Sequence, residues 1–123
     1  MQDTTSKAFQ NWIALKSLSL SHFPSYGQCS IVYALRNGRT GEILKFGKAS
    51  CARDRIFRNY IGGAGGATTK RIHDNLFADA EIEHVEIAWN QTTTGAGAEL
   101  AEKRYRTKYV AEHGHRPLWD LRD

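Results

Sequence analysis

The sequence of 123 residues is long enough for one domain of ordinary size and too short for two. Hydrophobic residues make up 41% and charged residues 24%, a balance that excludes global disorder. No apolar stretch reaches the roughly 18 residues of a membrane span, and the N-terminus lacks the pattern of a signal peptide. We therefore expect a cytoplasmic protein without a membrane partner, whose two cysteines, Cys29 and Cys51, are free thiols.

The net charge of +4 is modest, but it is unevenly distributed along the chain. Residues 36–71 contain nine Lys or Arg and two acidic residues, a net of +7. Residues 72–99 contain six acidic residues and no Lys or Arg. A basic block of this size suits a polyanion such as nucleic acid, because each phosphate contact releases counterions. A solvated basic surface is the alternative interpretation of the same charge.

A helix and a hairpin are the elements expected in the first part of the chain. Residues 6–20 place apolar side chains at helical spacing, which predicts an amphipathic helix that packs on a sheet or on a partner. Residues 30–36 and 42–47 are typical of short strands. The intervening residues 37–41 contain two glycines, which favour a tight turn, so the strands are expected to form an antiparallel hairpin.

The register of this hairpin would decide which side chains face each other. Pairing Arg36 with Glu42 would place Tyr33 directly opposite Lys45 on one face. An ammonium beside a phenol favours the phenolate and lowers the phenolic pKa. A solvent-facing Tyr–Lys pair without a chemical role is the alternative.

Three helices and one strand are expected after the hairpin: helices at residues 52–60, 68–77 and 98–112, and a strand at residues 81–89. The glycine-rich loop over residues 61–67 lacks the Gly-Lys-Ser or Gly-Lys-Thr of a phosphate-binding loop. Thr94 is the expected cap of the last helix, and Gly114 its end. The predicted fold is an α/β domain around a small three-stranded antiparallel or mixed sheet flanked by helices.

Several of these residues resemble the motifs of the GIY-YIG nuclease superfamily. Ile31-Val32-Tyr33 stands where the first motif of that family would be, and Lys45-Phe46-Gly47 stands where the second would be. Arg55 resembles the family's helix Arg, and Glu102 its metal-binding Glu. The segment from Pro117 to Asp120 resembles the closing Pro-x-x-Asn. The resemblance covers residues 29–121, and it predicts a nuclease domain at residues 29–123 after an N-terminal helical extension at residues 1–28.

Three positions depart from the family pattern. Ile31 replaces a Gly, Lys45 replaces the second Tyr, and Asp120 replaces the closing Asn. Lys45 either stands in for the Tyr or marks a variant branch such as the restriction-type members. Glu99, one helical turn before Glu102, competes with it as the metal ligand.

The resemblance implies a metal-dependent endonuclease that hydrolyses phosphodiester bonds in DNA, with double-stranded DNA as the expected partner. Tyr33 would take the proton from the attacking water, directly or by orienting it, with its pKa lowered by Lys45 or Lys48. Arg55 would contact the scissile phosphate. Glu102 would hold one Mg²⁺ or Mn²⁺ per site, which waters and the substrate phosphate would complete.

Further basic and aromatic side chains of the same region are candidates for binding the substrate: Lys48, Arg58, Tyr60, Lys70, Arg71 and His73. For His73, a surface or helix-capping role is the alternative. We also expect the basic block and the Glu102 helix to line one groove.

Other classes of function fit parts of the same sequence. A catalytically inactive nucleic-acid-binding module, in which Lys45 has removed catalysis, predicts binding without cleavage. A protein-interaction domain would make the basic block incidental. Structural zinc would need the two cysteines and His84, His113 and His115, of which only the last two have a recurring ligand spacing. A homodimer would let two sites cut both strands.

Overall fold

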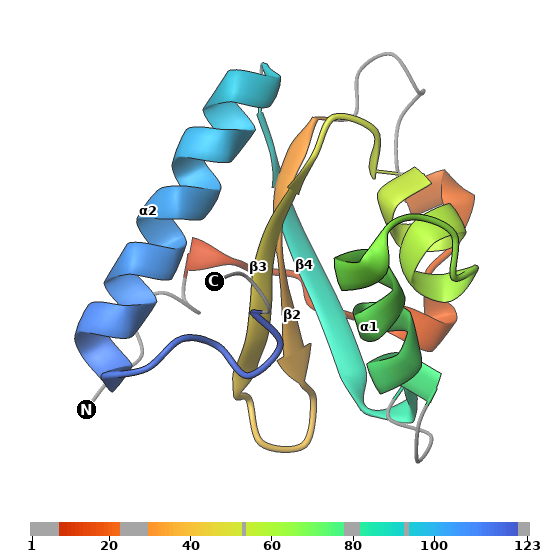
Figure 1. The fold of residues 1–123 in the computed structure, drawn as a ribbon, viewed down its shortest axis with the longest axis horizontal. Coiled ribbons are helices and arrows are strands. Elements are labelled where there is room, and N and C mark those ends of the chain that lie inside the picture. Colours follow the sequence, from red (N-terminus) through yellow and green to blue (C-terminus); the bar gives the residue numbers. More distant parts are fainter. Residues whose placement is uncertain (1–7, 23–29, 53, 78–81, 93, 121–123) are drawn as a thin grey trace.

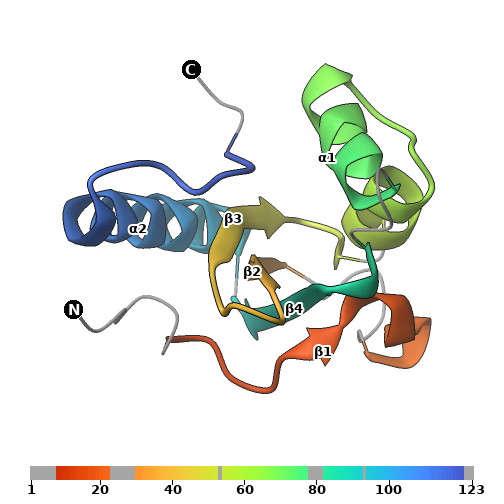
Figure 2. The ribbon, with the colours of Figure 1, turned by 90° about the horizontal axis from the view of Figure 1, so that it is seen from below.

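The computed structural model describes residues 8–22, 30–52, 54–77, 82–92 and 94–120. Its strands form one antiparallel sheet in the order β1-β4-β2-β3. They are β1 (Ile13–Ala14), β2 (Ile31–Asn37), β3 (Ile43–Ala49) and β4 (Val85–Gln91). Helix α2 (Gly95–His113) covers one face, while the π-helix η5 (Asp54–Ile61) and α1 (Ala67–Phe77) lie beyond the other (Figures 1 and 2). The fold is α/β as predicted, but the sheet has four strands rather than three.

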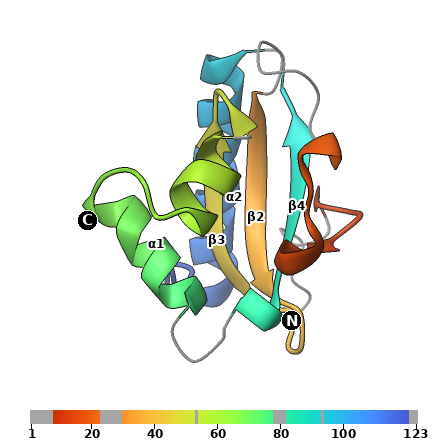
Figure 3. The same ribbon diagram turned by 90° about the vertical axis from the view of Figure 1, so that its right-hand side faces the viewer.

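The N-terminal region adds a strand to the sheet where a helix was expected. Over the described part of residues 6–20, β1 pairs with β4, and 3₁₀ turns follow at Leu15–Ser17 and Leu20–His22 (Figure 3). Phe9 is buried with the side chains under α2, whereas Leu15 is buried on the opposite face of the sheet. The prediction of a helix was wrong because the apolar side chains are divided between two faces, and long-range packing outweighs local periodicity.

The alternation of side chains along the strands builds a core on each face of the sheet. In β2, Ile31, Tyr33 and Leu35 face η5 and α1. Val32 and Ala34 face the opposite way and pack with Tyr109 of α2. Every residue of β2 from Ile31 to Leu35 is buried, so this strand is the centre of both cores.

The hairpin forms as predicted, but its register differs because β3 contains a bulge. Arg36 pairs with Ile43, whereas Leu35 pairs with Lys45, so Leu44 is an extra residue on β3. The carbonyl of Leu44 accepts a hydrogen bond of 2.7 Å from the amide of Trp119 in the C-terminal segment. Beyond the bulge, Tyr33 pairs with Gly47, so the predicted direct pairing of Tyr33 with Lys45 was wrong.

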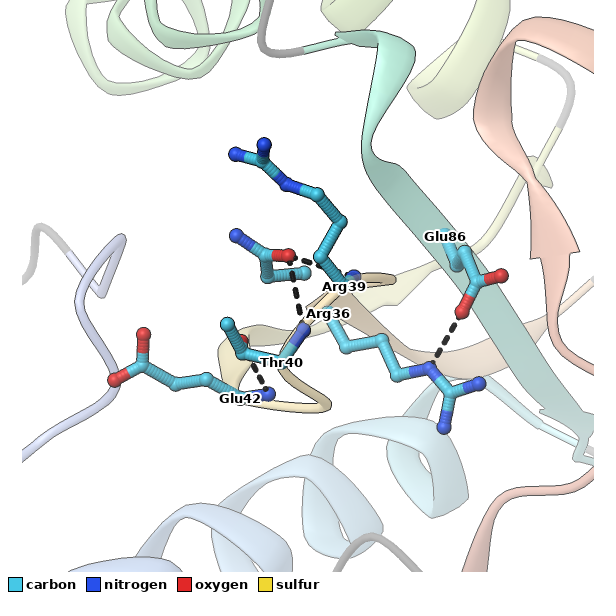
Figure 4. Close-up of polar contacts among 6 residues, drawn as sticks. Arg36, Arg39, Thr40, Glu42 and Glu86 are labelled. Atoms are coloured by element: carbon cyan, nitrogen blue, oxygen red, sulfur yellow. Dashed lines mark hydrogen bonds and ion pairs between the residues drawn. The ribbon is translucent and has the colours of Figure 1, made fainter.

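Polar contacts define the closed end of the hairpin (Figure 4). The Asn37 side-chain oxygen accepts hydrogen bonds from the amides of Arg39 and Thr40, at 2.8 and 3.3 Å. Gly41 follows with a φ of 77°, a conformation that favours glycine. On the neighbouring strand, Glu86 accepts a hydrogen bond of 2.7 Å from Arg36 Nε.

The later elements largely match their predictions. Helix α1 lies where it was expected, and α2 begins at its predicted cap, where Thr94 Oγ1 accepts a hydrogen bond of 3.0 Å from the Gly97 amide. Gly114 ends α2 in the left-handed conformation, with a φ of 79°. Strand β4 starts at Val85 rather than at residue 81, because a 3₁₀ turn occupies residues 82–83. In the described residues, every helix is too short or too polar to cross a membrane.

Candidate active site

A cavity of about 170 Å³ lies on the sheet face that carries η5 and α1. Its walls come from two strands, the π-helix and α1. They are formed by Tyr33, Lys45, Gly47, Lys48, Arg55, Tyr60, Thr69 and Ile72. The cavity thus brings together side chains that are separated by up to 39 residues, including five of the predicted cations and phenols.

Tyr33 crosses the outer strand of the sheet at Gly47. A Cβ atom at position 47 would overlap Cζ and Oη of the Tyr33 ring, so the ring occupies the space that any side chain there would need. Because β3 is at the edge of the sheet, this path takes the Tyr33 hydroxyl toward η5 while the ring stays buried. Glycine at position 47 is therefore required by the close approach of a side chain and not by its backbone angles.

The Tyr33 hydroxyl forms a hydrogen bond with the Tyr60 hydroxyl. The two rings meet edge to face, with their centroids 6.1 Å apart. Tyr60 follows Arg55 by five residues, and both line the cavity. This spacing fits the π-helix, in which the Gly62 amide donates to the Phe57 carbonyl five residues back, so one turn is wider than in an α-helix.

Burial raises the pKa of Tyr33 well above its ordinary value of 10.0, and the neighbouring Tyr60 raises it further. The charge of Arg55 lowers this pKa and that of Glu102 raises it. The expectation that Lys45 or Lys48 would lower the Tyr33 pKa is therefore wrong in two respects. The opposing cation is Arg55, and desolvation outweighs it, so the Tyr33 hydroxyl keeps its proton at neutral pH.

Lys45 lines the same cavity as Tyr33 although the two do not face each other in the ladder. Its side chain is only 5% exposed, which is rare for lysine. Lys48 and Arg55 complete the cationic part of the wall. Three positive groups around one small volume suit an anion of the size of a phosphate.

A second hollow of about 310 Å³ continues the site toward the start of α2. It shares Lys48 and Arg55 with the first cavity, and Ser50, Gly95 and Glu99 are among its other walls. Lys48 Nζ lies 3.2 Å from Glu99 Oε2. The two hollows therefore lie side by side at the edge strand β3, and we call them together the groove.

Glu102 lies on the face of α2 that packs against the sheet, and it is 2% exposed. Its Oε1 accepts a hydrogen bond of 2.9 Å from Arg106 Nη1, and Arg106 Nε is 3.9 Å from Asp120 Oδ2. Glu102 does not line either hollow, but its charge acts on the Tyr33 hydroxyl. Glu99, the competing carboxylate, is exposed and lines the second hollow.

Glu99 and Glu102 are the carboxylates that could bind a divalent cation here. Mg²⁺ commonly uses one or two protein carboxylates and takes its other ligands from water and phosphate. Glu102 has the right ligand type for such an ion and its charge acts on Tyr33, while it lines neither hollow and Arg106 engages one of its oxygens. Among the described residues, no three His, Cys, Asp or Glu side chains gather as a metal site, which leaves the structural-zinc alternative without support there. Cys29 lies outside the described residues, and Cys51 forms no disulfide bond within them.

The remaining substrate-binding candidates lie away from the cavity walls. Arg58, Lys70 and Arg71 are exposed on η5 and α1. The Nδ1 atom of His73 donates a hydrogen bond of 2.8 Å to the Tyr60 carbonyl, so it positions the Tyr60 backbone. Thr69, one turn before His73 on α1, lines the cavity and was not predicted, because a threonine near the start of a helix suggests only a cap.

The basic block of residues 36–71 is divided between distant parts of the molecule. Lys45, Lys48 and Arg55 reach the groove. Arg36 instead pairs with Glu86 and lies 4.2 Å from the Trp12 ring centroid. The expectation that the whole block lines one groove was therefore wrong.

Comparisons with family models, curated proteins and solved structures found no match to this chain. The resemblance to GIY-YIG nucleases therefore stays a prediction that rests on the motif residues. Of those residues, the structure gathers Tyr33, Lys45 and Arg55 around one cavity, and it brings the charge of Glu102 to bear on Tyr33.

Proposed function

We propose that this protein is a metal-dependent endonuclease that hydrolyses phosphodiester bonds in DNA. The observation that carries the proposal is the arrangement around the Tyr33 hydroxyl. Tyr60 forms a hydrogen bond with it, while the charges of Arg55 and Glu102 both act on it. A phenol, a guanidinium and a carboxylate from distant parts of a chain are the groups that the resemblance to GIY-YIG nucleases implies for this reaction.

Arg55 is the group best suited to the scissile phosphate. A guanidinium is planar and always charged, and it can donate two parallel hydrogen bonds to one phosphate. Arg55 lines both hollows, so it stands where they join. Lys45 and Lys48 would add positive charge around the phosphate and stabilise the charge that develops during hydrolysis.

Tyr33 would act on the attacking water. Its raised pKa keeps the phenol protonated at neutral pH, and Tyr60 fixes the direction of its hydroxyl. A protonated phenol orients a water by hydrogen bonding, and only the ionised form takes a proton as a general base. The base role is thus expected to grow as the pH rises, and the orienting role applies at neutral pH.

Glu102 would hold the divalent cation, Mg²⁺ or Mn²⁺. The chemistry that this ion supplies when bound is neutralisation of charge on the phosphate oxygens. Arg106 holds one oxygen of the Glu102 carboxylate at 2.9 Å and so fixes its direction. The buried Asp120 lies on the far side of Arg106 and balances part of its charge.

Nicking of supercoiled plasmid DNA in the presence of Mg²⁺ tests this function. We expect the wild-type protein to nick, and Arg55→Ala and Glu102→Gln to lose nicking. Arg39→Ala is the matched control, because Arg39 is exposed on the hairpin turn and not among the walls of either hollow. Nicking that persists at the wild-type rate in both variants would contradict the residue assignments.

A nucleic-acid-binding module without catalysis is the second candidate. Two observations favour it: Lys45 stands where the family's second Tyr would be, and the Tyr33 pKa is raised. It predicts that the wild-type protein binds duplex DNA in a salt-dependent way but leaves plasmid uncut with Mg²⁺ and with Mn²⁺.

A further inference from the structure

The outward face of α2 carries a third hollow, of about 420 Å³. We define the outer face of α2 by the residues that line it: Leu100, Lys103, Arg104, Thr107, Lys108 and Ala111. All six are exposed, and Leu100 is 56% exposed. Their spacing places them on the side of the helix that faces away from the buried Ala98, Glu102 and Tyr109.

The charge on this outer face is entirely positive. Lys103, Arg104 and Lys108 are its only charged residues, and none of them forms an ion pair within the described part of the chain. By contrast, the exposed Lys16 and the half-buried Lys48 each pair with a glutamate. The outer face therefore offers three cations to an external polyanion.

The outer face belongs to the same helix whose first turns line part of the proposed active site. Gly95, Ala98 and Glu99, in the first turns of α2, line the second hollow together with Arg55. From Glu99 to Ala111 the helix rises about 18 Å, which corresponds to about five nucleotide steps along one DNA strand. A duplex held at Arg55 could therefore follow α2 across this distance.

We propose that the outer face of α2 binds the phosphate backbone of the duplex that flanks the cleaved bond. This proposal rests on the proposed nuclease function and adds a substrate-binding surface to it. Charge complementarity favours nucleic acid, and helix α2 carries both this face and part of the second hollow. A second copy packed helix to helix would instead bring like charges together, and an acidic protein is the remaining occupant to be tested.

The salt dependence of DNA binding tests the proposal. The variant Lys103→Gln/Arg104→Gln/Lys108→Gln removes three charges and keeps good helix formers. Binding to a fluorescent duplex of about 30 base pairs is measured by anisotropy as salt increases. Each lost phosphate contact reduces the slope of log K against log salt by about 0.9, so we expect a reduction of about two to three. Among single variants, Arg104→Gln should lower the slope by about one, and the matched Arg39→Gln should not.

The outcomes separate this proposal from the nuclease function. Equal slopes for the wild-type protein and the triple variant, with equal helical content by circular dichroism, would overturn the DNA-binding role of the outer face even if the wild-type protein nicks plasmid. Loss of binding to polyglutamate with unchanged binding to DNA would also overturn it and would favour an acidic protein partner. A wild-type protein that binds DNA with the predicted difference in slopes but never nicks would contradict the nuclease function alone.

Discussion

Tyr33 and Gly47 face each other across the β2–β3 ladder, and the Tyr33 ring fills the space into which a side chain at position 47 would point. This relationship lets a buried tyrosine cross the edge strand and present its hydroxyl to Tyr60. The glycine of the second motif therefore has a steric task that is separate from any catalytic one.

Replacing Gly47 by alanine should overpack this crossing. The new methyl group would overlap the Tyr33 ring, and such overpacking typically costs about 1 to 3 kcal/mol of unfolding free energy. Urea denaturation measures the cost. Gly95→Ala is the control, because a Cβ there has no atom within 4 Å and Gly95 is the first residue of α2. Equal stabilities of the two variants would contradict the close approach of Tyr33 to Gly47.

The two tyrosine hydroxyls should be energetically coupled. Tyr60→Phe leaves the buried Tyr33 hydroxyl without the partner that it has in the wild-type protein, which should cost about 1 to 3 kcal/mol. The double variant Tyr33→Phe/Tyr60→Phe should cost less than the sum of the single variants. The unfolding free energies of the wild-type protein, the two single variants and the double variant form a double-mutant cycle. A cost of the double variant equal to the sum of the two single costs would mean that the hydrogen bond contributes nothing to stability.

The stability of the protein should fall in alkaline solution. Above pH 10 an unfolded tyrosine loses its proton, while Tyr33 in the folded protein keeps it because its pKa is raised. The folded state then binds more protons than the unfolded state, so the unfolding free energy falls by up to about 1.4 kcal/mol per pH unit. Denaturation at increasing pH should show a smaller fall for Tyr33→Phe than for the wild-type protein. Tyr105→Phe, at a half-buried position, is the control.

Loss of the Arg55 guanidinium should reduce cleavage more than loss of any exposed arginine. By analogy with other groups that stabilise developing charge, Arg55→Ala should lower kcat by about 10² to 10³. Single-turnover cleavage of a labelled duplex measures the effect, with Arg39→Ala as the control. Similar rates for the two variants would show that Arg55 does not contact the scissile phosphate.

The two glutamates of α2 should differ in their dependence on metal. Glu102→Gln should raise the Mg²⁺ concentration needed for half-maximal cleavage by more than about 10-fold. Mutation of a residue that only orients a metal ligand typically lowers metal affinity by at least about 10-fold, and loss of the ligand itself should lower it at least as much. Glu99→Gln breaks only an ion pair with Lys48 that is exposed to solvent, and it should have a small effect. Chelation of the metal by EDTA should stop cleavage in all the proteins. A larger effect of Glu99→Gln would identify Glu99 as the ligand.

Local chemistry made much of the fold predictable. The cap at Thr94 and the left-handed Gly114 bound α2 within a few residues of the expected ends, because each depends only on neighbouring backbone groups. The hairpin strands were also predictable from their composition and turn. The bulge at Leu44 was not, because nothing in the run Ile43-Leu44-Lys45 marks its middle residue as unpaired.

Long-range contacts account for what the sequence did not reveal. Ile13 and Ala14 form a strand only because β4 is beside them, and periodicity alone favoured a helix. The partner of Tyr33 was expected to be Lys45, whereas the wide turn of η5 brings Tyr60 to it. The raised pKa of Tyr33 depends on burial by both the sheet and η5, which no local pattern encodes.

The hydrogen bond from the Trp119 amide to the Leu44 carbonyl affects how readily another chain could pair with the edge strand β3. An outermost strand with open backbone groups is a template on which another chain can add a strand and aggregate. At the bulge of β3, the protein's own C-terminal segment forms a hydrogen bond with one of these backbone groups, the Leu44 carbonyl. At the opposite border of the sheet, β1 is only two residues long. Both borders of the sheet are thus poor templates, so the hollows at the β3 edge do not come with an open strand that invites fibre-like self-association.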